Sequence, residues 1–156
     1  MRLIALMLCC GLSLSTAVYA ADKAPVSVTM VAVQAKNEGR SVKFFGEGLQ
    51  KVRSAVGGLG YDTFRKLSAI ETTIPFNEET KLRINEHYSL YLTPVSVDAQ
   101  GRIRMRARLT MTSREKKKTV NALDTVLTMA PGKHLNLGGL RLEDGELVVV
   151  LTARQN

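Results

Sequence analysis

The chain has 156 residues, of which 22 are basic and 14 acidic, so its formal net charge is +8, and it contains no Trp. This length corresponds to one ordinary domain, which can bury a core without covalent cross-links. The two cysteines, Cys9 and Cys10, both lie in an apolar run near the start. Removal of that run would exclude disulfide scaffolds and cysteine nucleophiles from the rest of the chain.

The first twenty residues have the pattern of a secretory signal peptide. Arg2 supplies a positive start, residues 3–14 form a short apolar run, and Val18 and Ala20 place small side chains before Ala21. A retained membrane anchor and lipidation are the alternatives. The run is shorter than the ~20 apolar residues of a span, and a lipidation cut would fall inside it. We therefore predict a signal peptide over 1–20, a disordered lead over 21–25 and a single domain over 26–156.

The first predicted elements are a strand and a helix. Apolar residues fill one alternate set of positions from Val26 to Ala32, and Val31 and Val33 make the other set apolar towards the end, which favours a strand covered on both faces. Ser41 can cap a helix whose apolar face repeats every three or four residues, and Gly57 and Gly58 can end it. The residues of that face are Val42, Phe45, Leu49, Val52 and Val56. Gly46 and Gly48 weaken this helix, and we interpret them as points of close approach to a sheet.

After Gly60 the sequence indicates only strands. Alternating or β-branched segments cover 61–74, 81–84, 88–97, 102–112, 119–129, 134–137 and 147–152. The segments between them contain turn residues such as Asp98, Gly132 and Gly145. We expect an α+β fold, in which one helix packs on a mostly antiparallel sheet or sandwich and the N-terminal elements form a βαβ-like unit.

Arginine occupies every second position along one predicted strand. Because side chains alternate across a strand, these four guanidinium groups share one face, and apolar residues between them face the core. Two further cations alternate in the same way on an earlier strand. The predicted basic face therefore comprises Arg102, Arg104, Arg106, Arg108, Lys81 and Arg83, and Arg114 with Lys116, Lys117 and Lys118 extends the positive charge into the next turn.

This basic face has two interpretations. The planar guanidinium can make two parallel hydrogen bonds to a carboxylate or phosphate, which favours an anion-binding surface. The competing interpretation is a solvated face on which the arginines pair with acidic residues of neighbouring strands. Nucleic acid is a disfavoured partner because no stacking aromatic residues alternate with the arginines.

Catalytic and metal-binding patterns are weak. His87 and His134 are the only histidines, and their separation matches no metal-ligand spacing. Ser89 shares a strand face with His87 but lacks a nucleophile-elbow motif. Gly57, Gly58 and Gly60 follow a predicted helix, whereas a phosphate-binding loop precedes one. We predict no enzyme activity, no metal and no cofactor.

One resemblance concerns the C-terminal segment. The string Gly132-Lys133-His134-Leu135-Asn136-Leu137-Gly138-Gly139-Leu140, followed by Gly145-Glu146-Leu147-Val148-Val149-Val150, resembles the G-x-x-x-x-[VIL]-G-G hairpin of outer-membrane secretins. It also resembles small exported bacterial proteins that have a Tyr-x-x-Phe strand, here Tyr61 and Phe64. The resemblance implies a β-rich envelope protein; it implies neither a pore nor any functional residue.

These observations predict a periplasmic or secreted, non-enzymatic module that binds a partner or stabilises an envelope assembly. The expected partner is an anionic envelope component or an acidic protein, and no transmembrane segment remains after cleavage. The alternative is a small exported hydrolase or inhibitor that uses His87 or His134. A third possibility is a subunit whose edge strands complete a larger sheet.

Overall fold

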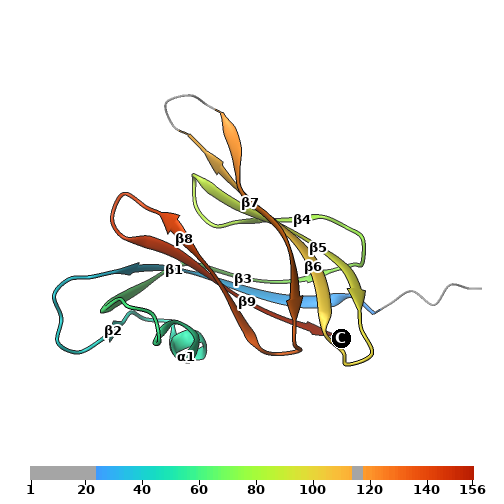
Figure 1. The fold of residues 1–156 in the computed structure, drawn as a ribbon, viewed down its shortest axis with the longest axis horizontal. Helices are drawn as coiled ribbons and strands as arrows, with labels where there is room; N and C mark the ends of the chain where they lie inside the picture. The colour runs from blue at the N-terminus through green and yellow to red at the C-terminus, as the bar shows by residue number, and fades with distance from the viewer. Residues whose placement is uncertain (1–23, 114–117) are drawn as a thin grey trace, which may run out of the picture.

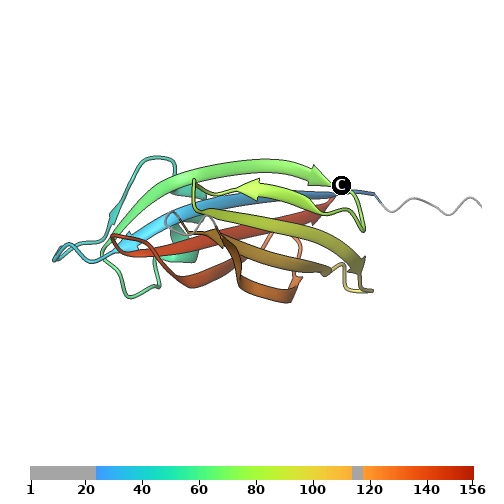
Figure 2. The ribbon, with the colours of Figure 1, turned by 90° about the horizontal axis from the view of Figure 1, so that it is seen from above.

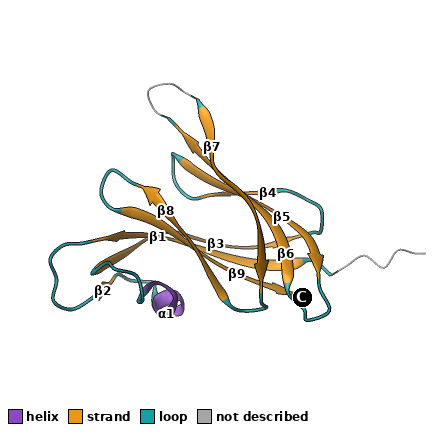
Figure 3. Ribbon diagram, in the orientation of Figure 1, coloured by secondary structure: helices purple, strands orange, loops and turns teal. Residues whose placement is uncertain are grey.

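The computed structural model describes residues 24–113 and 118–156. Figure 1 shows its strands and Figure 3 its single α-helix. In chain order the elements are β1 (Val26–Lys36), β2 (Phe44–Phe45), a 3-10 turn (Gln50–Val52), α1 (Arg53–Val56), β3 (Thr63–Ile74), β4 (Thr80–Arg83), β5 (Tyr88–Val97), β6 (Ile103–Thr112), β7 (Thr119–Met129), β8 (His134–Arg141) and β9 (Glu146–Gln155). The predicted signal peptide and residues 21–23 of the predicted lead lie outside the described residues.

The strands form two sheets. Sheet A has five strands in the order β2-β3-β1-β9-β8, and sheet B has four in the order β4-β5-β6-β7. All neighbouring strands are antiparallel except the short pair β2 and β3. Figure 2 shows β1 and β9 running side by side along the length of the molecule, where Val31 lies opposite Val150.

The main core lies between the two sheets. Alternate residues of the strands point inward, so that both sheets present apolar faces to each other. The fully buried members include Met30, Leu90, Leu92, Met105, Leu109, Val149 and Leu151. The chain is therefore a β-sandwich.

A second, smaller core lies on the outer face of sheet A. The helical segment places Leu49, Val52 and Val56 on that face, where they pack with Phe64 and with valines of β1 and β9. These two strands are therefore covered on both sides there, which explains why Val31 and Val33 are apolar although they point away from the main core.

The prediction of an α+β fold with a helix over 42–56 is wrong. The helical segment consists of the 3-10 turn and the four-residue α1. Phe44 and Phe45 pair instead with β3, and Gly48 adopts a φ of +77°, which a helix does not allow. A Cβ on Gly46 would lie 3.2 Å from the carbonyl oxygen of Phe64, so this glycine does approach a sheet closely, although it directly follows β2 and is not part of a helix.

The predicted βαβ-like unit is also wrong. β1 and β3 are antiparallel neighbours, whereas a βαβ unit joins parallel strands through a crossover of a dozen or more residues. The helical segment ends at Val56 and is too short to carry the chain along the sheet. The predicted stop at Gly57 is confirmed, but this glycine has a right-handed φ of −62°.

The predicted strands after Gly60 are confirmed, with small shifts of their ends. β8 runs four residues beyond the predicted end at Leu137. Gly138 and Gly139 shift the register there but do not end the strand, and pairing with β9 resumes at Leu140. Across the described ranges, no helix is long and apolar enough to span a membrane.

Candidate functional site: the outer face of sheet B

β6 positions the arginine row. It lies in the interior of sheet B between β5 and β7, and its inward residues Ile103, Met105, Ala107 and Leu109 are fully buried. Because these side chains are fixed in the core, Arg104, Arg106 and Arg108 project from the opposite face, as the alternation predicts. Alternate residues of a strand are about 7 Å apart.

Two arginines of the row are paired with acidic side chains. The Nε of Arg102 lies 2.6 Å from the Oδ2 of Asp98, and the Nη2 of Arg108 donates to both carboxylate oxygens of Glu79 at 2.9 Å. The hydrogen bond to Glu79 raises the pKa of Arg108 above its ordinary value. At these two positions the basic face is a set of internal ion pairs.

One cation of β4 and one of β6 lie against the same aromatic ring. Lys81 lies opposite Tyr91 on β5, and its Nζ is 5.7 Å from the ring centroid. The guanidinium of Arg108 is 4.4 Å from the same centroid. Arg83 donates from Nε to the carbonyl of Asn85 at 3.3 Å. These contacts hold three of the predicted cations against the sheet.

Arg104 and Arg106 differ from the other arginines. Both are exposed, and within 24–113 and 118–156 neither forms an ion pair or a hydrogen bond through its side chain. Their cross-strand neighbours are uncharged: Ser96 and Thr128 beside Arg104, and Thr93 and Val126 beside Arg106. The structure therefore leaves two adjacent guanidinium groups open to a ligand.

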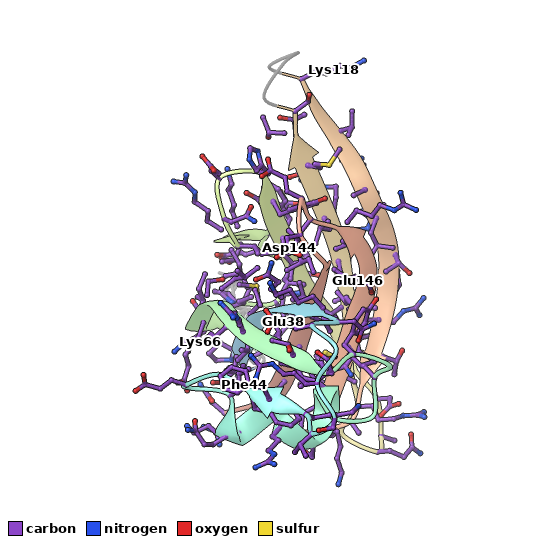
Figure 4. The ribbon with its side chains drawn as sticks, turned by 90° about the vertical axis from the view of Figure 1, so that its left-hand side faces the viewer. Glu38, Phe44, Lys66, Lys118, Asp144 and Glu146 are labelled. Atoms are coloured by element: carbon purple, nitrogen blue, oxygen red, sulfur yellow. The ribbon has the colours of Figure 1, made fainter. Side chains whose placement is uncertain are left out.

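The predicted extension of positive charge lies largely outside the described residues, because it involves Arg114, Lys116 and Lys117. Lys118 is described and is exposed directly before β7 (Figure 4).

The two histidines lie in different parts of the fold. His87 precedes β5; its Nδ1 is 3.3 Å from the carbonyl oxygen of Thr112 and its Nε2 is 3.6 Å from Glu86. His134 begins β8, and its Nδ1 is 2.8 Å from the hydroxyl of Thr152. Among the described residues, no group of three or more His, Cys, Asp or Glu side chains is arranged to hold a metal ion.

The structure contains two features that no pattern in the sequence predicts, a cleft and a group of charged side chains. A cleft of about 620 Å³ opens at one end of the sandwich, with His87, Leu67, Met111 and Leu142 in its lining. Nearby, Lys36 joins Glu38 and Asp144 at 2.9 and 2.7 Å, and both carboxylates are labelled in Figure 4. Both features assemble residues that are far apart along the chain, so no local pattern indicates them.

Comparison with known proteins finds no family model that matches the chain, and no curated protein or solved structure with significant similarity to it.

Proposed function

We propose that this protein is an exported, non-enzymatic binding module that contacts an acidic partner through the outer face of sheet B. The observation that carries the proposal is the pair Arg104 and Arg106, which is exposed, forms no ion pair among the described residues and has no acidic residue directly opposite on either adjacent strand. The one acidic residue of β7, Asp124, lies opposite Arg108. An arginine that serves only the stability of a sheet is expected to have an acidic residue opposite it on a neighbouring strand. Arg104 and Arg106 have none at that position.

The surroundings of the pair support a preformed contact surface. Arg102 and Arg108 flank the pair on the same strand and are already neutralised by Asp98 and Glu79. β6 is an interior strand whose inward side chains are fully buried, so the backbone under both arginines is fixed. A ligand with two acidic groups about 7 Å apart could bind both guanidinium groups. Because the backbone is already ordered, binding would not carry the entropy cost of ordering it.

Export is supported by residues 1–20, which have the composition of a cleavable leader. It places the binding module in the periplasm or outside the cell, where acidic proteins and other anionic envelope components are the available partners. Both sheets and both cores lie within 24–156. The chain without residues 1–20 therefore keeps every described contact.

The test compares two double variants of that chain. Arg104→Ser with Arg106→Ser removes the open pair, and Lys133→Ser with Arg154→Ser removes the same charge from exposed positions outside sheet B. At low salt, the affinity for immobilised poly-glutamate should fall about tenfold for the first variant and much less for the second. The difference should shrink as salt rises, because salt screens exposed charges.

Equal retention of the two variants at low salt would contradict the proposal, because the arginine pair would then be a solvated face. Vesicles of anionic lipid and an acidic polysaccharide, used as parallel probes, show whether the pair prefers acidic protein to the other anionic components.

A further inference from the structure

β7 is the long free edge of sheet B. It has eleven residues, and no described strand pairs with its outer side. The other three sheet edges are shorter or interrupted: β2 has two residues, β4 has four, and β8 has a register shift at Gly138 and Gly139. An unpaired strand edge presents backbone N–H and C=O groups that can pair with another chain.

The second half of β7 lacks the features that usually protect such an edge. Its one register shift lies near Ala122, so the pairing of residues 123–129 with β6 is continuous. This segment contains no Pro, no Gly and no Lys, and Asp124 is its single charge. By contrast, the short edge β4 carries Lys81 and Arg83, and exposed cations of this kind discourage strand addition.

The two faces of this segment are chemically distinct. On the outer face, Asp124 lies directly opposite Arg108, Val126 opposite Arg106 and Thr128 opposite Arg104. On the inner face, Leu123 and Leu127 are only partly buried, and Leu135 and Leu137 of β8 are partly buried against the same core. A strand added beside β7 would therefore meet the open pair Arg104 and Arg106 next to Val126 and Thr128 on one face, with Asp124 beyond them, and incompletely covered leucines on the other.

We propose that the partner contributes an extended segment of alternating acidic and apolar residues, which pairs with residues 123–129 of β7 as a fifth strand of sheet B. Its backbone would use the free edge, its apolar side chains would cover Leu123 and Leu127, and its acidic side chains would reach Arg104 and Arg106. The inference rests on the proposed function and specifies its partner as a protein segment.

The geometry allows this contact. Neighbouring strands lie about 4.8 Å apart, so the added strand lies about 10 Å from β6, with only the small side chains of Val126 and Thr128 between them on the outer face. An arginine and a glutamate side chain together span this gap. Alternation along the added strand keeps all its acidic residues on the face of the arginine pair.

The chain without residues 1–20 contains no cysteine, which permits a site-specific test. Val126→Cys places a thiol on the outer face of the edge strand, and Val95→Cys places one on β5, where the valine is exposed to a similar extent, 43% against 46%. The probe is a peptide of about nine residues that alternates Glu and Val and has Cys in place of its central Glu. This Cys is activated as a mixed disulfide with thiopyridine, so the protein thiolate displaces thiopyridone when the disulfide forms. A second peptide has Lys in place of every Glu.

We expect the Glu peptide to form a disulfide with Val126→Cys about tenfold faster than with Val95→Cys, because only the edge position has a cross-strand neighbour in the added strand. The Lys peptide should react slowly with both. Adding Arg104→Ser and Arg106→Ser to Val126→Cys should remove the advantage of the Glu peptide. Thr128→Cys repeats the test if the first variant does not fold.

Equal rates at Val126→Cys and Val95→Cys, or no reaction, would overturn the edge-strand inference. If retention on poly-glutamate still depends on Arg104 and Arg106, the proposed binding function remains. If that dependence is also absent, both the inference and the proposed function fail.

Discussion

Glu38 forms ion pairs with three basic side chains at one end of the molecule. Its carboxylate lies 2.9 Å from Lys36, 2.9 Å from Arg40 and 3.3 Å from Arg65. The hydrogen bond from Lys36, followed by that from Arg40, lowers the pKa of Glu38 from 4.5 to about 2. The backbone N–H of Glu38 in turn donates to Asp62, whose pKa is lowered from 3.8 to about 2 mainly by this bond.

These two carboxylates make stability depend on acid. Each binds a proton more tightly in the unfolded chain than in the folded one, so each contributes stability that is present above its ordinary pKa and is lost as the pH falls towards about 2. We expect the thermal midpoint to fall between about pH 5 and pH 2. Glu38→Gln with Asp62→Asn should lower the midpoint at neutral pH and flatten this decline.

The measurement is thermal unfolding followed by circular dichroism across this pH range. Glu47→Gln is the control, because Glu47 is exposed and has no ion pair within the described part of the chain. A decline in the double variant as steep as in the unaltered protein would show that other groups govern acid unfolding.

At the scale of elements, glycines shape β8 and the turn that joins it to β9. Gly138 and Gly139 interrupt the register of β8, and the N–H of Gly139 donates to the carboxylate of Glu146 at 2.6 Å. Glu146 also accepts a hydrogen bond from the hydroxyl of Tyr61. Gly145, at the turn into β9, has a φ of +88°, and a Cβ there would lie 2.5 Å from the carbonyl oxygen of Ala35.

Two alanine substitutions separate the cost of a left-handed backbone conformation from the cost of a steric clash. Gly139 has a φ of +86° and nothing within 4 Å of the Cβ position, so Gly139→Ala should cost only the left-handed conformation, about 1–2 kcal/mol. Gly145→Ala should cost distinctly more, because the backbone of β1 must also move. Urea unfolding of both variants tests this difference, and equal losses of stability would mean that the contact at Ala35 relaxes freely.

The elements also show what the sequence can predict. Strands such as β5 and β6 were predictable because alternation reflects one buried and one exposed face. The absence of a long helix was not predictable. The spacing of the apolar residues between Phe45 and Val56 indicates which of them face sheet A, but several backbone conformations can bring them there. Local spacing leaves the conformation of Gly48 undetermined, and that conformation depends on the pairing of Phe44 and Phe45 with β3.

The site was predictable to a similar degree. Alternation places Arg104 and Arg106 on one face, but the distinction between paired and open arginines depends on contacts between strands. Glu79 reaches Arg108 from 29 residues away, whereas Asp98 reaches Arg102 across one turn. Only the latter pairing could be read from spacing along the chain.

At the scale of the whole molecule, the proposed export has a definite chemical consequence. Cleavage after Ala20 would remove both cysteines and leave a chain that begins at Ala21. Mass spectrometry of the protein from the cell-envelope and secreted fractions should therefore give the mass of residues 21–156. Recovery of the chain with residues 1–20 intact in the cytosol would contradict export.

The placement of β1 and β9 at the centre of sheet A affects when the chain can fold. Val26 is the partner of Gln155, so β1 lacks one neighbour until β9 has been synthesised. Pairings that span so much sequence form slowly, because the closure of a long loop precedes them. A growing polypeptide therefore remains without its completed sandwich until β9 is available. In the proposed export, this delay would favour passage of an unfolded chain through a narrow translocation pore.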